Sequence, residues 1–146
     1  MHAAAVRRGT DGGVALCGAS GSGKGTARDH FEGACDELAI LTPAGAGIEI
    51  HSTPYWNGIP FRARCGGVVC LERGGEPALR ATRGAEALRA LAQHLIRYTS
   101  LPRVEHAILN LAAEVCRRMV VTVATCPQGA AFLPFLSAGL LLEEAR

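Results

Sequence analysis

The apolar positions of the chain follow two different rhythms. In the first half, short apolar or alternating stretches bounded by Gly, Pro and polar residues predict β-strands. Those stretches cover residues 2–8, 13–17, 35–41, 48–51 and 68–71, with a shorter one at 76–82. Between them, residues 42–47 predict a turn, and residues 52–64 predict an irregular loop that holds the single Trp of the chain.

In the second half, the apolar spacing changes to that of amphipathic helices. Leucines on one face predict a helix over residues 85–96. Pro102 opens a second helix, whose apolar stripe ends at Val115. Residues 120–123 then predict a last strand, and residues 127–144 predict a closing helix. The predicted order is therefore strands first and paired helices later.

A glycine-rich segment follows the second predicted strand. It comprises Gly18, Ala19, Ser20, Gly21, Ser22, Gly23, Lys24, Gly25 and Thr26. A strand, a glycine-rich turn and a short helix over residues 24–32 are the parts of a phosphate-binding loop. The glycines let backbone N–H groups turn toward an anion, and the helix adds its positive end. Lys24 would reach the β- and γ-phosphates of a nucleotide.

The metal-binding hydroxyl of such loops is displaced in this chain. Gly25 stands where a Ser or Thr usually follows the lysine, and Thr26 supplies the hydroxyl one position later. A divalent metal also needs a carboxylate, which one member of the acidic pair Asp36-Glu37 could provide. Adjacent strand residues point to opposite faces, so only one of the two easily faces a nucleotide.

Length and composition favour one globular domain over residues 1–146. Hydrophobic residues make up 49% of the chain and charged residues 19%, which is typical of a protein with a packed core. A net charge of +2 and an aromatic content of 5% do not favour nucleic-acid binding. No apolar run is long enough to span a membrane, and the first residues do not resemble a signal peptide. We therefore expect a cytoplasmic protein that binds neither nucleic acid nor membrane.

The six cysteines do not indicate a disulfide framework or a metal centre. None of them forms a Cys-x-x-Cys pair, and most lie in apolar stretches. We interpret them as buried free thiols that behave as small hydrophobic side chains.

With the loop and its flanks in view, the chain resembles the catalytic domain of HPr kinase/phosphorylase. It is most similar to the short bacterial HPr-kinase-like proteins related to ATP-dependent phosphoenolpyruvate carboxykinase. The resemblance rests on His2 before a strand pair, the glycine-rich loop, the acidic pair within residues 35–38, and the later segments 53–56 and 69–73. It implies an α/β fold in which helices flank a mixed β-sheet that carries a P-loop.

The resemblance also implies a reaction and its residues. It predicts a kinase that uses ATP and Mg²⁺ to phosphorylate a serine hydroxyl of a protein or peptide. ATP would bind at the glycine-rich loop, and Thr26 and Asp36 would hold the metal. Alternatively, Asp36 would act as the general base with help from Glu37; His2 and Lys24 complete the predicted catalytic set. The family further implies a homo-oligomer.

Two other functions also fit the loop. The Lys24-Gly25-Thr26 ending is similar to that of adenylate-kinase-like enzymes and allows a nucleoside-monophosphate kinase, although residues 27–80 contain no convincing arginine-rich lid. Gly25 and the short following helix favour a non-catalytic nucleotide-binding regulator.

Arg62 and Arg64 could hold an acceptor's phosphate or carboxylate, but we interpret them first as exposed strand charges. We interpret His94 as a surface or packing residue.

Overall fold

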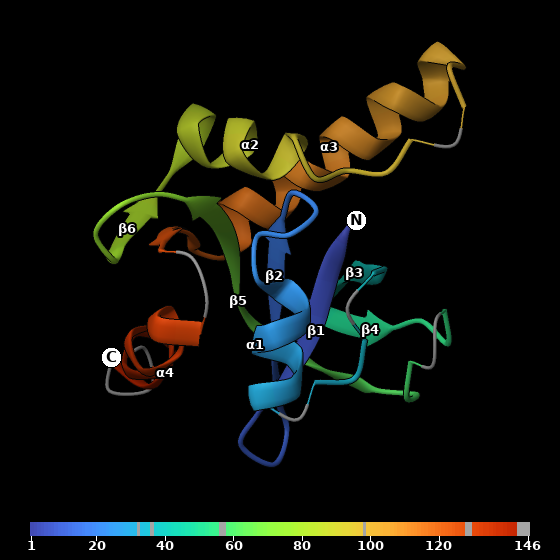
Figure 1. Cartoon of the computed structure of the whole chain (residues 1–146). Helices are drawn as coiled ribbons and strands as arrows, with labels where there is room; N and C mark the ends of the chain where they lie inside the picture. The colour runs from blue at the N-terminus through green and yellow to red at the C-terminus, as the bar shows by residue number, and fades with distance from the viewer. Residues whose placement is uncertain (32, 36, 56–57, 98, 128–129, 143–146) are drawn as a thin grey trace.

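The computed structural model describes residues 1–31, 33–35, 37–55, 58–97, 99–127 and 130–142. Within these residues, a seven-stranded sheet has helices on both faces (Figure 1). The strands are β1 (Ala3–Arg8), β2 (Gly12–Gly18), β3 (Ala39–Ala44), β4 (Gly47–Ser52), β5 (Arg62–Arg73), β6 (Ala78–Thr82) and β7 (Val121–Cys126). The helices are α1 (Lys24–His30), α2 (Gly84–Ala92), α3 (Pro102–Arg118) and α4 (Leu133–Leu142), with a 3₁₀ turn at Ala130–Phe132.

The sheet is mixed, with a parallel centre and antiparallel flanks. Strand order is β1-β2-β5-β4-β3, and β7 lies between β5 and β6. β5 pairs in parallel with β2 and with β7, whereas every other strand pair is antiparallel. The predicted α/β class with a mixed sheet and flanking helices is therefore confirmed.

The long strand β5 has different neighbours along one of its edges. β2 pairs with one edge of β5 over residues 64–71. On the opposite edge, residues 62–64 pair with β4 and residues 68–73 pair with β7. Neither β4 nor β7 pairs with residues 65–67, so the sheet forks there. Gly66 is also bulged out of the β2 ladder, since the register shifts from Gly13–Cys65 to Val14–Gly67.

Alternation along the central strands divides the core into two apolar layers. In β2, Ala15 and Cys17 face one layer, whereas Val14 and Leu16 face the other. The first layer is covered by α2 and α3, and the second by α1 and the start of α4. Ala3, Ala4 and Ala5 of β1 are fully buried. Helices therefore cover both faces of the strand that leads into the glycine-rich loop.

The structure corrects the strand predicted at residues 35–41. Strand β3 spans Ala39–Ala44, and Cys35 makes only an isolated bridge to Ala5. Thr42 and Pro43, expected in a turn, belong to β3. The proline is tolerated because β3 is an edge strand, where one missing N–H costs no ladder bond.

The boundaries of other elements also differ from those predicted from the sequence. β5 begins at Arg62, inside the segment predicted to be an irregular loop, and extends well beyond the predicted residues 68–71. The predicted closing helix 127–144 is instead a 3₁₀ turn followed by α4. The amino-terminal half of α3 projects past the sheet (Figure 1). Leu111 of the predicted apolar stripe, just beyond the middle of the helix, is 39% exposed.

The six thiols lie mostly inside the protein. All cysteines are free, and five of the six are buried. Burial raises the pKa of Cys17 well above its usual range and that of Cys65 to about 11, so both remain neutral. Among the described residues, no helix is long and apolar enough to span a membrane.

Candidate functional site

The glycine-rich loop (residues 18–26) joins the end of β2 to α1 at one edge of the sheet. Gly21 and Gly23 adopt positive φ angles of 73° and 101°, which side chains disfavour. The Ser22 N–H donates to the Ala19 carbonyl at 3.1 Å, and the Ala27 N–H donates to the Gly23 carbonyl at 2.9 Å. These bonds wind the backbone into a tight turn that ends where the first helical turn begins.

At two positions of the loop, the neighbouring atoms also leave no space for a side chain, so glycine is required there. A Cβ at Gly18 would lie 2.2 Å from Ser22 Oγ, and a Cβ at Gly23 would lie 2.8 Å from the tip of the Phe132 ring. Phe132 is 1% exposed and anchors the start of α4 in the second core layer. The loop is therefore packed from beneath by a buried ring that leaves no space for a side chain at Gly23.

Lys24 places its ammonium group directly against the loop. Its Nζ donates to the Gly18 carbonyl at 2.8 Å and to the Ala19 carbonyl at 3.0 Å. The residue is only 6% exposed, so the charge lies at the wall of the loop rather than in bulk solvent. A buried ammonium next to turned backbone amides can attract an anion.

A cavity of about 490 Å³ opens beside Lys24. His2, Thr26 and Glu37 line it together with loop residues. His2 Nε2 lies 3.3 Å from Glu37 Oε2 across this cavity. The backbone N–H of His2 donates to the His94 carbonyl at 2.8 Å, which fixes the start of β1 to the end of α2. The structure thus brings together four predicted residues from three separate segments.

A second cavity, of about 330 Å³, lies on the other side of the loop. Arg73, from the end of β5, donates from Nε and Nη2 to the Gly21 carbonyl at 3.2 and 2.7 Å. Ser22 and Thr26 line the same cavity. Ser22 Oγ is buried and has no hydrogen-bond partner within the described part of the chain.

Sequence reasoning missed two residues at this site. Arg73 was included only as part of a segment of family resemblance, and His94 was interpreted as a surface or packing residue. His94 is half-buried, and burial, followed by the charges of Lys24 and His2, lowers its pKa. No local motif marks either residue, because each reaches the loop only through the pairing of distant elements.

The remaining predicted residues fall in different places. Asp36 and Trp56 lie outside the described residues. Glu37 lies in a connecting segment and not on a strand. Arg62, at the start of β5, forms an ion pair of 2.8 Å with Glu49 of β4, and Arg64 lies two residues further along β5. Neither arginine lines the two cavities at the loop.

The donor atoms beside the loop are oxygens of the kind that Mg²⁺ prefers. The Thr26 hydroxyl and the Glu37 carboxylate line the cavity next to Lys24. Within the described residues, no group of three His, Cys, Asp or Glu side chains is close enough to form a metal centre by itself. A metal here would therefore share its coordination with phosphate oxygens, as Mg²⁺ does in nucleotide sites.

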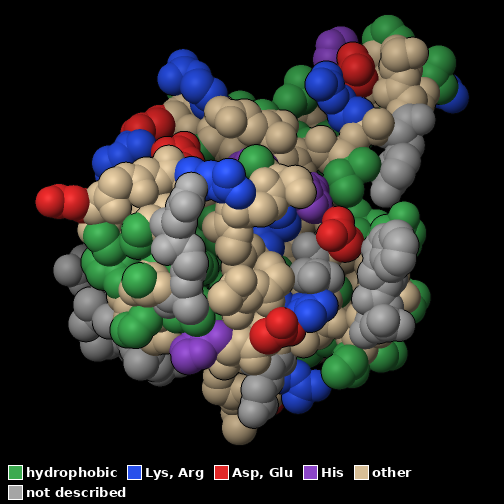
Figure 2. Space-filling view, in the orientation of Figure 1, with side chains coloured by type: hydrophobic (Ala, Val, Ile, Leu, Met, Phe, Trp, Pro, Cys, Tyr) green, Lys and Arg blue, Asp and Glu red, His purple; other side chains and the backbone are tan. Residues whose placement is uncertain are grey.

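Charge around the site is local and not part of a large patch. Figure 2 shows Lys, Arg, Asp and Glu side chains dispersed over the face that carries the loop. The anion affinity of this edge therefore depends on the few groups just described and not on a general basic surface.

Comparison with solved structures shows that the fold of this chain is similar to that of the Hpr(Ser) kinase/phosphatase from Coxiella burnetii. The likeness covers 99% of this chain and 89% of that chain, with a TM-score of 0.54 and 9% sequence identity. At this identity it shows a relationship between folds. No protein-family model and no curated protein matches the sequence.

Proposed function

We propose that this chain binds ATP at the glycine-rich loop and transfers its γ-phosphate to a serine hydroxyl of a protein or peptide. The observation that carries the proposal is the cavity beside Lys24, where a buried ammonium faces Thr26, His2 and Glu37. The kinase/phosphatase with a similar fold supports the choice of phosphoryl transfer.

Phosphate binding would use the backbone and two cations. The loop amides surround the phosphates, and Lys24 turns its Nζ from the Gly18 and Ala19 carbonyls toward the β- and γ-phosphates. Arg73 stands 2.7 Å from the Gly21 carbonyl and adds a second charge on the far side of the loop. Ser22 Oγ, which has no hydrogen-bond partner among the described residues, would donate to a phosphate oxygen. Charge neutralisation of this kind supplies most of the catalysis in phosphoryl transfer.

Transfer also requires a group that takes the proton of the acceptor. The serine oxygen attacks the γ-phosphorus, the bond to the β–γ bridging oxygen breaks, and the serine proton passes to a carboxylate. We assign that role to Asp36 with help from Glu37, whose carboxylate is oriented by His2 at 3.3 Å. Thr26 would hold Mg²⁺, which neutralises charge on the β- and γ-phosphates when bound; a metal-ligand role for Asp36 beside Thr26 is the alternative to its role as base.

One observation favours a second candidate, nucleotide binding without transfer. Helix α1 has only seven residues, and Gly25 leaves the position after the lysine without a hydroxyl. A protein with these features could sense ATP and pass the signal to a partner. Binding is common to both candidates, whereas turnover separates them.

Titration calorimetry with ATP and Mg²⁺, followed by a phosphate-transfer assay on a serine-peptide array, tests the proposal. We expect Lys24→Ala to weaken ATP binding by about tenfold or more. Arg89→Ala, an exposed arginine of α2, is the matched control and should leave binding unchanged. Unchanged binding in Lys24→Ala would refute the loop assignment.

Carboxylate variants test the chemistry apart from binding. We expect Asp36→Asn to abolish most transfer and Glu37→Gln to reduce it, with ATP affinity changed little by comparison. If Asp36→Asn transfers phosphate as fast as the unmodified protein, the assignment of the base is wrong. ATP binding with no transfer to any peptide would select the second candidate.

A further inference from the structure

A large cavity lies far from the glycine-rich loop. It has a volume of about 910 Å³ and is lined by Gly12 at the start of β2, by Arg64, Cys65 and Gly66 of β5, and by Val120 just before β7. These residues mark the amino ends of the parallel strands, whereas the glycine-rich loop follows the carboxyl end of β2. In Figure 1 the β1–β2 turn and the glycine-rich loop lie at opposite ends of β2.

The fork in the sheet explains why a cavity exists here. β4 leaves the edge of β5 after residue 64, and β7 joins it only at residue 68. Residues 65–67 therefore have no strand on that edge, and the bulge at Gly66 bends β5 at the same point. Ile48 of β4 and Val120 form parts of the wall on the two sides of the gap.

Four arginines from four different elements line this cavity. Arg8 ends β1, Arg64 lies near the start of β5, Arg83 precedes α2 and Arg118 ends α3. Asp11 is the one carboxylate among the lining residues. The sequence separates the four arginines by 19 to 56 positions, so only the fold brings them to one cavity.

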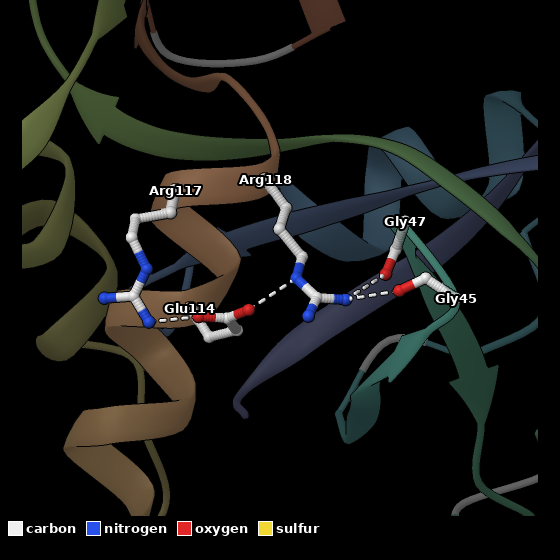
Figure 3. A network of polar contacts seen from close by, with 5 residues as sticks. All are labelled: Gly45, Gly47, Glu114, Arg117 and Arg118. Carbon is white, nitrogen blue, oxygen red and sulfur yellow. Dashed lines mark hydrogen bonds and ion pairs between the residues drawn. The ribbon is translucent and has the colours of Figure 1, made fainter.

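Arg118 is held at the rim by a network shown in Figure 3. Its Nε donates to Glu114 at 2.6 Å, and its Nη1 donates to the Gly45 and Gly47 carbonyls at 2.9 and 3.2 Å. Arg117 binds the same carboxylate, and both arginines lower the pKa of Glu114. Within the described residues, no hydrogen bond of this network uses Nη2 of Arg118, which leaves that nitrogen for a ligand.

Two of the other arginines, Arg64 and Arg83, contribute charge that no described carboxylate neutralises. Arg64 and Arg83 are exposed, and no described carboxylate forms an ion pair with either. Arg8 extends over the bulge, since a Cβ at Gly66 would lie 3.3 Å from its Nη1. Cys65, beneath them, keeps a neutral thiol because burial raises its pKa to about 11.

We propose that this arginine cavity is a second anion site that binds a small molecule with at least two phosphate groups. Planar guanidinium groups match phosphate oxygens two at a time, and several of them need a ligand with several charges. The volume lies within the range of small-ligand pockets. Ile48, Met119 and Val120 add apolar wall for an uncharged part of the ligand. This site is independent of the proposed function of the glycine-rich loop.

Inorganic pyrophosphate is the probe, and Lys24→Ala is the background that weakens competing binding at the loop. Calorimetry should show that pyrophosphate still binds the Lys24→Ala protein. Adding Arg64→Gln or Arg83→Gln should then weaken binding roughly tenfold each. Arg89→Gln, an exposed arginine outside the cavity, is the control and should leave affinity unchanged.

A second measurement avoids any effect of Lys24→Ala on folding. In the unmodified protein, pyrophosphate should shift the backbone amide resonances of Gly12, Gly66 and Val120 as a group separate from those of the loop. The proposal is overturned if these resonances do not move, or if Arg64→Gln and Arg83→Gln leave pyrophosphate affinity unchanged. Binding of a polyglutamate peptide in place of pyrophosphate would overturn the ligand class.

Discussion

The two ends of the parallel strands arrange their polar groups very differently. At the carboxyl end of β2, a tight loop presents backbone amides, and a buried Lys24 lies on two carbonyl oxygens. At the amino ends, a forked sheet leaves a cavity lined by four guanidinium groups. One end relies on the backbone conformation of nine consecutive residues, and the other relies on side chains from distant parts of the chain.

This difference determines how each end tolerates change. In a loop whose shape depends on glycines, one added side chain should disrupt the backbone conformation. The positive φ angles disfavour a Cβ, and the surrounding packing leaves no space for it. A cavity lined by long, flexible arginines loses one contact at a time. The following predictions test that contrast, from the largest expected effect to the smallest.

Replacing Gly23 should damage the loop end severely. Gly23→Ala puts a Cβ at a φ of 101° and 2.8 Å from Phe132, so strain and overpacking together should cost about 2–4 kcal/mol of unfolding free energy. Gly9→Ala is the matched control at the arginine end. Gly9 also has a positive φ, of 60°, but its added Cβ meets nothing within 4 Å, so the cost should be about 1 kcal/mol.

Urea unfolding of the two variants measures both values. Gly23→Ala should also lose ATP binding under conditions where it remains folded, whereas Gly9→Ala should keep it. Equal destabilisation by the two substitutions would show that Phe132 can move aside, and the packing argument for the loop would fail.

Much of the fold could be predicted from the sequence where the pattern is local. Strands β1 and β2, helix α1 and the two later helices follow apolar spacing and terminal residues. Strand β3 could not be placed, because Pro43 is a turn signal unless the strand is known to lie at an edge. Its edge position depends on the pairing of β4 with β5, which no local pattern encodes.

The candidate sites divide in the same way. The glycine-rich loop is contiguous, so its residue types could be recognised directly. His2 was chosen only by family resemblance, and Glu37 as one of two carboxylates after the loop; their approach to 3.3 Å is a tertiary feature. Arg64 was interpreted first as an exposed strand charge. The other residues of the two sites were assigned to none, because their meeting depends on strand order and on the fork in β5: Arg8, Arg73, Arg83, His94 and Arg118.

The free energy of unfolding should depend on pH through His94, which lies at the loop end of the sheet and not at the arginine end. The pKa of His94 is lowered from 6.5 by burial and by Lys24 and His2, so the folded protein takes up this proton less readily than the unfolded chain. The resulting stability is present above pH 6.5 and is lost as the pH falls through the lowered pKa. Because His94 is only half-buried, we expect a loss below about 1 kcal/mol.

Thermal unfolding between pH 7.5 and pH 5 measures this loss. His94→Gln should have a flatter profile over that range, whereas Arg83→Gln, at the other end of the sheet, should keep the profile of the unmodified protein. Identical profiles for His94→Gln and the unmodified protein would mean that His94 does not sense the charges at the loop.

The smallest effect concerns the rim of the arginine cavity, where two neighbouring arginines share Glu114 (Figure 3). Arg118 also joins α3 to the β3–β4 turn through two carbonyls, whereas Arg117 binds only the carboxylate. Arg118→Ala should therefore lower the Tm by about 1–3 °C, and Arg117→Ala should lower it by less than about 1 °C.

The same pair of variants has a pH signature. Both arginines lower the pKa of Glu114 below 4.5, so the stability they share is complete above that pH and is lost as the pH falls through the lowered pKa. The part of the Arg118→Ala deficit that comes from Glu114 should disappear in strong acid, and the part that comes from the Gly45 and Gly47 carbonyls should remain. A deficit that vanishes completely would mean that the carbonyl bonds contribute nothing, and that the rim of the cavity is held by charge alone.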